Sequence, residues 1–248
     1  MRLLLDFLCR FGWGMAVGLV FTPAAIVTPG FFRVNLLVVL GLATAAAAVA
    51  WRGEAASPAW LPAVGAAVTA WLGSVAWLGE KRRAGLWLCG LAAAWLAAAT
   101  VIVATGGAAG GGPGPSAWLP AVVSLVSGLV TGLTVHAMLL GHWYLNAPGM
   151  RVDALRRMID LALAAWGLQL VVAVGLWATG AVPAAGLTTS ALLALRWLAG
   201  LVGLPVLLVM ARKTLDIPNT QSATGILYVA CLAAILGELT AQLLQVSG

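Results

Sequence analysis

Apolar runs of about 20 residues recur along the whole chain, and short polar segments separate them. A helix needs roughly 20 apolar residues to cross a hydrocarbon core about 30 Å thick. Helices satisfy their own backbone hydrogen bonds in lipid, whereas open sheets do not. The pattern therefore predicts an all-α fold, a polytopic transmembrane helical bundle with short loops. We expect one integral membrane domain, 1–248, with eight spans at about 8–28, 31–51, 58–79, 84–105, 117–145, 155–179, 184–211 and 220–246.

Composition supports a membrane protein and excludes an ordinary soluble one. Hydrophobic residues make up 62% of the chain and charged residues 8%, against about 25% charged residues in soluble domains. The net charge of +6 does not indicate nucleic acid, because the basic residues lie in short loops between apolar runs. The expected partner is the lipid bilayer, with a homo-oligomer or a larger membrane complex as further alternatives.

The basic residues also predict the orientation of the chain. Cytoplasmic loops are enriched in Lys and Arg, and the segments after spans one, three, five and seven hold most of them, whereas the other side has Arg2, Arg10 and Arg52. We therefore expect a multi-pass protein of the plasma (inner) membrane with both termini outside. Asp6 and Arg10 are four residues apart, and we expect them to pair on a short interfacial segment before the first span.

The hexapeptide AWLPAV occurs twice, at Ala59–Val64 and Ala117–Val122, each time at the expected outer start of a span. Two spans separate the copies, so both enter the membrane in the same direction, as a parallel repeat of helical hairpins requires. The simpler explanation is an interfacial tryptophan followed by a proline in the first helical turn. Both interpretations stay open.

A charge in the seventh span gives the strongest candidate for a site. Arg196 lies near mid-span, where a charge is costly unless it is paired or hydrated. Glu238 in the eighth span would lie at a similar depth if the two spans are antiparallel neighbours. We predict that the two residues pair, either as a structural lock or as a site for a proton, ion or substrate. The polar face around Glu238 comprises Thr224, Tyr228 and Gln242.

Both histidines, His136 and His142, lie in the fifth span. They are about 120° apart around a straight helix and roughly 9 Å apart along it, so one metal ion cannot easily bind both. We predict no metal site and no cofactor; a haem would need a methionine as second ligand or a partner subunit. The candidate inner-side pocket comprises His136, His142, Trp143, Tyr144 and Asn146. The alternatives are an amphipathic belt at the headgroups and, for His136, a hydrogen bond between helices.

Two further features of the sequence concern packing and charge. Gly128 and Gly132 form a GxxxG step in the fifth span, which lets a neighbouring backbone approach closely. On the inner side, Arg156 and Asp160 are spaced to pair along one helix. We expect a basic rim there that either sets the topology or holds an anionic headgroup or phosphate. The rim comprises Arg33, Arg151, Arg156, Arg157 and Lys213.

The sequence favours a non-enzymatic integral membrane protein whose polar core handles a small solute or ion, or anchors a larger membrane complex. No span shows an evident break near the midplane, which weighs against a conventional secondary transporter. The first alternative is a quinone- or haem-associated subunit of an electron-transfer complex that uses the two histidines. The second is a membrane enzyme that acts on a lipid phosphate at the basic rim. No catalytic residue is assigned, because HExxH, GxSxG and dinucleotide motifs are absent from the sequence.

Overall fold

The computed structural model describes residues 1–52, 57–106, 118–147, 149–178, 187–217 and 219–247. Within these ranges every regular element is helical, and eight helices are long and apolar enough to cross a membrane. The expected all-α membrane bundle is therefore confirmed. The helices are α1 (Arg2–Phe21), α2 (Pro29–Arg52), α3 (Trp60–Leu78), α4 (Arg82–Thr105), α5 (Leu119–Asn146), α6 (Asp153–Ala178), α7 (Leu187–Leu195), the π-helix η1 (Arg196–Gly203), α8 (Leu204–Thr214) and α9 (Thr220–Ser247).

The chain divides into two compact units, Met1–Gly132 and Leu133–Gly248. The division falls within α5, so the first half of this helix belongs to the first unit and its second half to the second. The expectation of one integral membrane domain stays a prediction.

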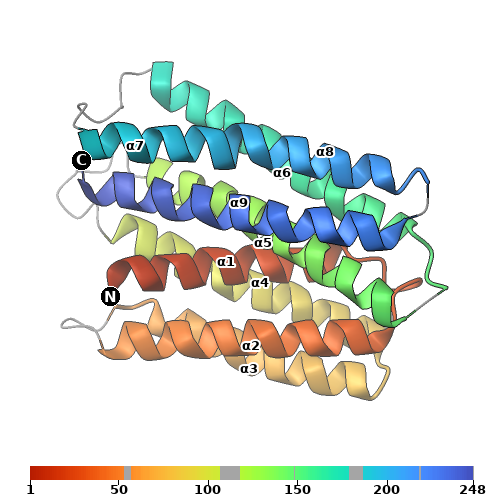
Figure 1. Ribbon diagram of the computed structural model, residues 1–248. Helices are drawn as coiled ribbons and strands as arrows, with labels where there is room; N and C mark the ends of the chain where they lie inside the picture. Colours follow the sequence, from red (N-terminus) through yellow and green to blue (C-terminus); the bar gives the residue numbers. More distant parts are fainter. Residues whose placement is uncertain (53–56, 107–117, 148, 179–186, 218, 248) are drawn as a thin grey trace. The chain divides into compact units, whose positions relative to one another are not determined.

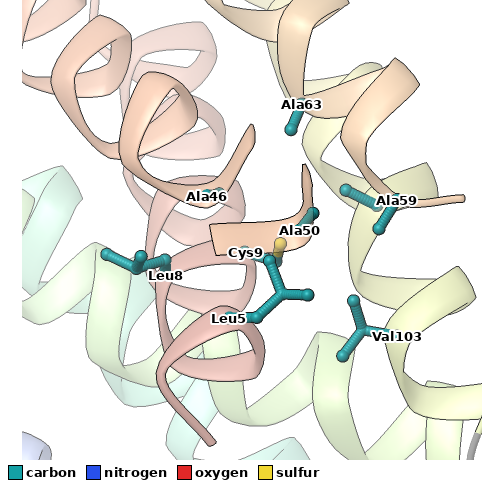
Figure 2. Packing of buried hydrophobic residues seen from close by; sticks show 9 residues of the cluster. Leu5, Leu8, Cys9, Ala46, Ala50, Ala59, Ala63 and Val103 are labelled. Carbon is teal, nitrogen blue, oxygen red and sulfur yellow. The ribbon is translucent and has the colours of Figure 1, made fainter. Parts of the chain in front are cut away.

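In the first unit, α2 packs against α3, α3 against α4, and α1 against both α2 and α4 (Figure 1). Small residues fill much of the space between these helices, so their backbones approach closely without the help of large side chains. Figure 2 shows one such cluster, in which Leu5 and Cys9 of α1 lie among alanines of the neighbouring helices. The buried members of the cluster are Leu5, Leu8, Cys9, Ala46, Ala50, Ala59, Ala63, Ala99 and Val103.

The predicted GxxxG step is the point where α1 crosses the first half of α5. A Cβ on Gly14 would overlap the backbone of Gly128, and a Cβ on Gly132 would overlap the backbone of Gly14. The same crossing brings the indole N–H of Trp13 within 3.1 Å of the Leu125 carbonyl oxygen, to which it donates. The expected close approach is confirmed, and α1 is the neighbour that makes it.

The first helix begins and ends earlier than the expected span 8–28, because it occupies Arg2–Phe21. Two features explain the difference. Asp6 and Arg10 pair within the helix, so their charges do not exclude it from the apolar interior. Pro23 restricts the residue before it to extended backbone and lacks an N–H, so the helix ends beforehand; Thr22 has extended backbone and donates its hydroxyl to the Gly18 carbonyl oxygen at 2.7 Å.

Both copies of AWLPAV lie at the start of a helix, as expected. Pro62 is in the first turn of α3 and Pro120 in the first turn of α5; Ala117 of the second copy lies outside the described residues. This position fits proline, whose missing N–H has no intrahelical partner there. The placement agrees with either interpretation of the repeat, so an internal duplication stays a prediction.

In the second unit, α7, η1 and α8 form one continuous rod that runs beside α9, and α6 packs against α8 (Figure 1). The middle of this span is a π-helix from Arg196 to Gly203 rather than a regular α-helix. Pro205 has no N–H to donate to the carbonyl oxygen of Leu201, four residues earlier. That oxygen instead accepts a bond of 3.2 Å from the indole of Trp166 in α6. The seventh span is therefore continuous, as expected of the spans, although its helix type changes at mid-length.

Gly14→Ala should destabilise the first unit, because the added Cβ would overlap the Gly128 backbone, which cannot move like a flexible side chain. Overpacking of this kind costs about 2 to 3 kcal/mol. The measurement is the free energy of unfolding of the purified protein in mixed micelles. Gly41→Ala is the matched control, because nothing lies within 4 Å of a Cβ at that position. Equal stability of the two variants would contradict the close crossing of α1 and α5.

Candidate intramembrane charged site

Three polar side chains of the second unit form the candidate group, namely Arg196, Glu238 and Gln242. Glu238 is 3% exposed and accepts a hydrogen bond of 2.8 Å from the Gln242 side-chain amide. Arg196 is partly buried and interacts electrostatically with Glu238. Arg196 lies nine residues after the start of α7 and Glu238 nine before the end of α9, so each is about 14 Å from its helix end. The predicted partners therefore lie close enough to interact, while a direct ion pair between them stays a prediction.

A glycine contact holds the backbones together beside this group. A Cβ on Gly237 would lie 2.7 Å from the Cα of Gly200, so η1 and α9 touch where both residues lack a side chain. Gly237 directly precedes Glu238, and Gly200 is four residues after Arg196. The contact fixes the spacing of the two helices next to the charges. The sequence shows a glycine in each of two neighbouring spans, but only the structure shows that the two glycines are in contact.

The residues on the polar face predicted for the eighth span have different hydrogen-bond partners along the helix. Thr224 is buried, and its hydroxyl donates to the carbonyl oxygen of Thr220 in its own helix at 2.7 Å. Tyr228 is 45% exposed and lies 3.0 Å from the ring of His142, measured from its hydroxyl oxygen to Nδ1. Among the described contacts, Thr224 and Tyr228 therefore have partners outside the Arg196 and Glu238 group.

The two histidines of the candidate inner-side pocket have different surroundings. His136 is fully buried in α5, whereas His142 is exposed near its end. Tyr144 donates its hydroxyl to the Arg151 carbonyl oxygen, and Asn146 donates its amide to the His142 carbonyl oxygen at 3.4 Å. Trp143 is partly buried. The structure thus joins His142 to Tyr228, which the sequence placed on the polar face of the eighth span and not in the candidate pocket.

The basic rim of the second unit is paired with acidic residues. Arg151 contacts Asp153 at 2.7 Å, and Arg212 contacts Asp160 at 2.8 Å. Arg156 donates to the Leu215 carbonyl oxygen and contacts Asp216 at 3.3 Å. The expected pair of Arg156 and Asp160 along one helix is wrong, since both residues pair with the end of α8 or the segment after it. These bonds tie the start of α6 to that region and neutralise part of the rim.

The other residues of the basic rim are exposed. Arg157 and Lys213 are exposed in the second unit, and Arg33 is exposed in α2 of the first unit. Exposed cations at helix ends agree with a role in topology and with a role in binding anionic headgroups. Both the role in topology and the role in binding headgroups therefore stay predictions.

A second buried charge pair lies in α1. The Arg10 guanidinium contacts the Asp6 carboxylate at 2.5 Å, and the two residues are 3% and 9% exposed. The i,i+4 spacing predicted the contact, which is confirmed, but not its burial. The carbonyl oxygen of Arg10 lies where α1 meets Gly128 of α5. The pair thus lies beside the crossing of α1 and α5 in the first unit, and its place at the membrane interface stays a prediction.

Within the described residues, no three His, Cys, Asp or Glu side chains are grouped so that they could hold a metal ion. The chain matches no protein-family model, no curated protein and no solved structure. Function is therefore inferred from the geometry of its own residues.

Glu238→Ala should lower the free energy of unfolding by about 3 to 5 kcal/mol, because it leaves the partly buried charge of Arg196 without its partner. The double variant Arg196→Met with Glu238→Leu should lose clearly less, since it removes both charges and keeps the volume. Unfolding in mixed micelles measures both. The exposed pair of Arg151 and Asp153 is the control, for which single substitutions should change stability by about 1 kcal/mol or less. Equal loss in the single and double variants would argue against pairing.

Proposed function

We propose that this protein handles a small ion or solute within the membrane, and that Arg196, Glu238 and Gln242 are the binding group. The observation that carries the proposal is a carboxylate, Glu238, that is almost fully buried about 14 Å from the end of its span and interacts electrostatically with an arginine of the neighbouring span. Ionisable residues at such a depth are rare and mark ion, proton and substrate pathways.

The chemistry of the group allows a small anion from outside the protein to take the place of Glu238 as the partner of Arg196. Arginine stays charged in proteins, so Arg196 needs a negative partner at all times. When Glu238 takes up a proton, a small anion would replace it at Arg196 without leaving an uncompensated charge. Gln242, which donates to Glu238 at 2.8 Å, can serve a carboxylate or a carboxylic acid, because its amide both donates and accepts. We therefore favour a proton together with a small anion as the species handled.

The π-helix supports a functional role for the same place. Segments of π-helix are rare and occur frequently at functional sites. Here the segment begins at Arg196 and packs against α9 through Gly200 and Gly237. An α-helix of the same length would place Arg196 and Gly200 at a different angle to each other around the axis, so the altered helix supports a special requirement at this place.

The alternative role is a structural lock, within the unit or within a larger membrane complex. A buried pair can fix helix register without binding anything. The two roles differ in what happens when charge is removed but shape is kept: a lock affects stability, whereas a binding site affects transport or binding.

We also infer that the ends of α5 and α8 face the cytoplasm of a plasma (inner) membrane. The support is the set of basic residues at that end of the second unit. Eight crossings would bring both termini to the same, outer side. The residues concerned are Arg151, Arg156, Arg157, Arg212 and Lys213.

Glu238→Gln should lower ion flux at least about tenfold while the protein stays folded, because the amide has nearly the same shape but cannot take up a proton. The measurement uses proteoliposomes with an internal pH dye, an imposed proton gradient and a panel of small inorganic and carboxylate anions outside. Asp153→Asn, in an exposed pair, is the matched control and should transport like the wild type. Circular dichroism and gel filtration report folding.

Wild-type flux equal to that of empty liposomes would overturn the transport role. Wild-type transport that Glu238→Gln leaves unchanged would remove Glu238 from the site. Loss of stability in Glu238→Gln together with wild-type flux equal to that of empty liposomes would favour the structural lock.

The orientation predicts the behaviour of two reporter fusions. Alkaline phosphatase is active only outside the cytoplasm, so it should be active when fused after Gly248 and inactive when fused after Met150. A fluorescent protein that matures only in the cytoplasm should give the opposite result at both positions. Reversed activities would place the termini inside.

A further inference from the structure

His142 and Tyr228 form a hydrogen-bonded pair on the exposed surface of the second unit. The Tyr228 hydroxyl lies 3.0 Å from His142 Nδ1, and the two rings meet edge to face with centroids 6.4 Å apart. Both residues are exposed, Tyr228 by 45%. The pair belongs to neither the Arg196 and Glu238 group nor the rim, so it needs its own explanation.

The depth of the pair places it at the edge of the hydrocarbon. Tyr228 is eight residues into α9, about 12 Å from its start, and His142 is four residues from the end of α5, about 6 Å. Each helix has 28 residues and is therefore about 42 Å long, so about 6 Å at each end extends beyond a 30 Å core. A molecule that reaches this exposed pair comes from the lipid.

The shared hydrogen bond leaves further hydrogen-bonding capacity for a ligand. If Tyr228 donates to Nδ1, the ring carries its proton on Nε2, which is then a free donor. If Nδ1 donates to the phenol oxygen, Nε2 becomes an acceptor and the phenol keeps a donor. Among the described contacts, no other hydrogen bond is made by either side chain. A polar group left unsatisfied against lipid is costly, which favours an occupant.

An open position lies beside the phenol. Gly225 is exposed one turn before Tyr228, and nothing lies within 4 Å of a Cβ at this position. A flat ring has room there against the edge of Tyr228. The surface thus offers a polar pair for an oxygen atom and an adjacent open position for a ring.

We propose that His142, Tyr228 and Gly225 form a binding site for a lipid-soluble quinone. The carbonyl oxygen of a quinone accepts a hydrogen bond, whereas the hydroxyl of the reduced form also donates one. The histidine and tyrosine pair matches either form by moving one proton between its own atoms. An ester carbonyl of a phospholipid only accepts, so it uses half of this capacity. The site is separate from the ion-handling group, and either can exist without the other.

Photolabelling tests the site. The full-length protein is placed in nanodiscs of one defined phospholipid without quinone, labelled with an azidoquinone and mapped by peptide mass spectrometry. Label should appear on the peptides that contain His142 and Tyr228, and a short-chain ubiquinone and its quinol should both displace it. Tyr228→Phe and Gly225→Leu should weaken binding about tenfold, the first by loss of a hydrogen bond and the second by filling the open position.

Gly175→Leu is the matched control, because Gly175 is also exposed with nothing within 4 Å of a Cβ, and it should bind like the wild type. Circular dichroism confirms that each variant is folded. Unlabelled peptides, or equal binding by wild type, Tyr228→Phe and Gly225→Leu, would overturn the proposal. Displacement by a fatty-acid methyl ester, which has no hydroxyl, as effective as that by ubiquinone would assign the site to ester lipids and overturn the proposal as well.

Discussion

Inside a bilayer, a polar group that lacks a partner within the protein has no water to replace it, and the described structure follows from this constraint. Glu238 receives a hydrogen bond from Gln242 and interacts with Arg196. Asp6 and Arg10 neutralise each other within one helix. Both solutions use charges that a soluble protein would leave in water. They differ in that the pair of α1 is local, whereas Arg196 and Glu238 depend on the packing of two spans.

Glycine and alanine make that packing specific. Lipid provides little hydrophobic drive for helices to associate, so close contact between backbones must hold them. The crossing at Gly14 and Gly128 does this in the first unit, and the contact of Gly200 with Gly237 does it in the second. In both places the contact lies next to a charged residue, Arg10 or Glu238. The glycines therefore bring the backbones of two helices together beside a charged residue in each unit.

The period and length of the apolar runs were enough to predict the membrane bundle, because a span must be apolar over its whole length. The pairing of Arg196 with Glu238 rests on their equal depths in neighbouring spans and stays a prediction. Three features needed the fold. The early end of α1 was signalled by Pro23, but the charges of Asp6 and Arg10 concealed its start. Arg156 and Asp160 have their partners at the end of α8 or in the segment after it, whereas helical spacing predicts only partners on the same helix. The bond between His142 and Tyr228 joins residues 86 positions apart, for which the sequence has no local signal.

The bond from Trp166 to the Leu201 carbonyl has a consequence for how this chain can vary. Pro205 removes the donor that this oxygen would have in an α-helix, and an indole from another span replaces it. Pro205 and Trp166 should therefore be kept or lost together among related sequences. In a related chain without the proline, the backbone N–H can donate to this carbonyl oxygen, so the tryptophan is no longer needed for that bond. A related chain that keeps the proline needs a side-chain donor at the position of Trp166. We therefore expect substitutions at positions 166 and 205 to occur together in related sequences that differ in the π-helix.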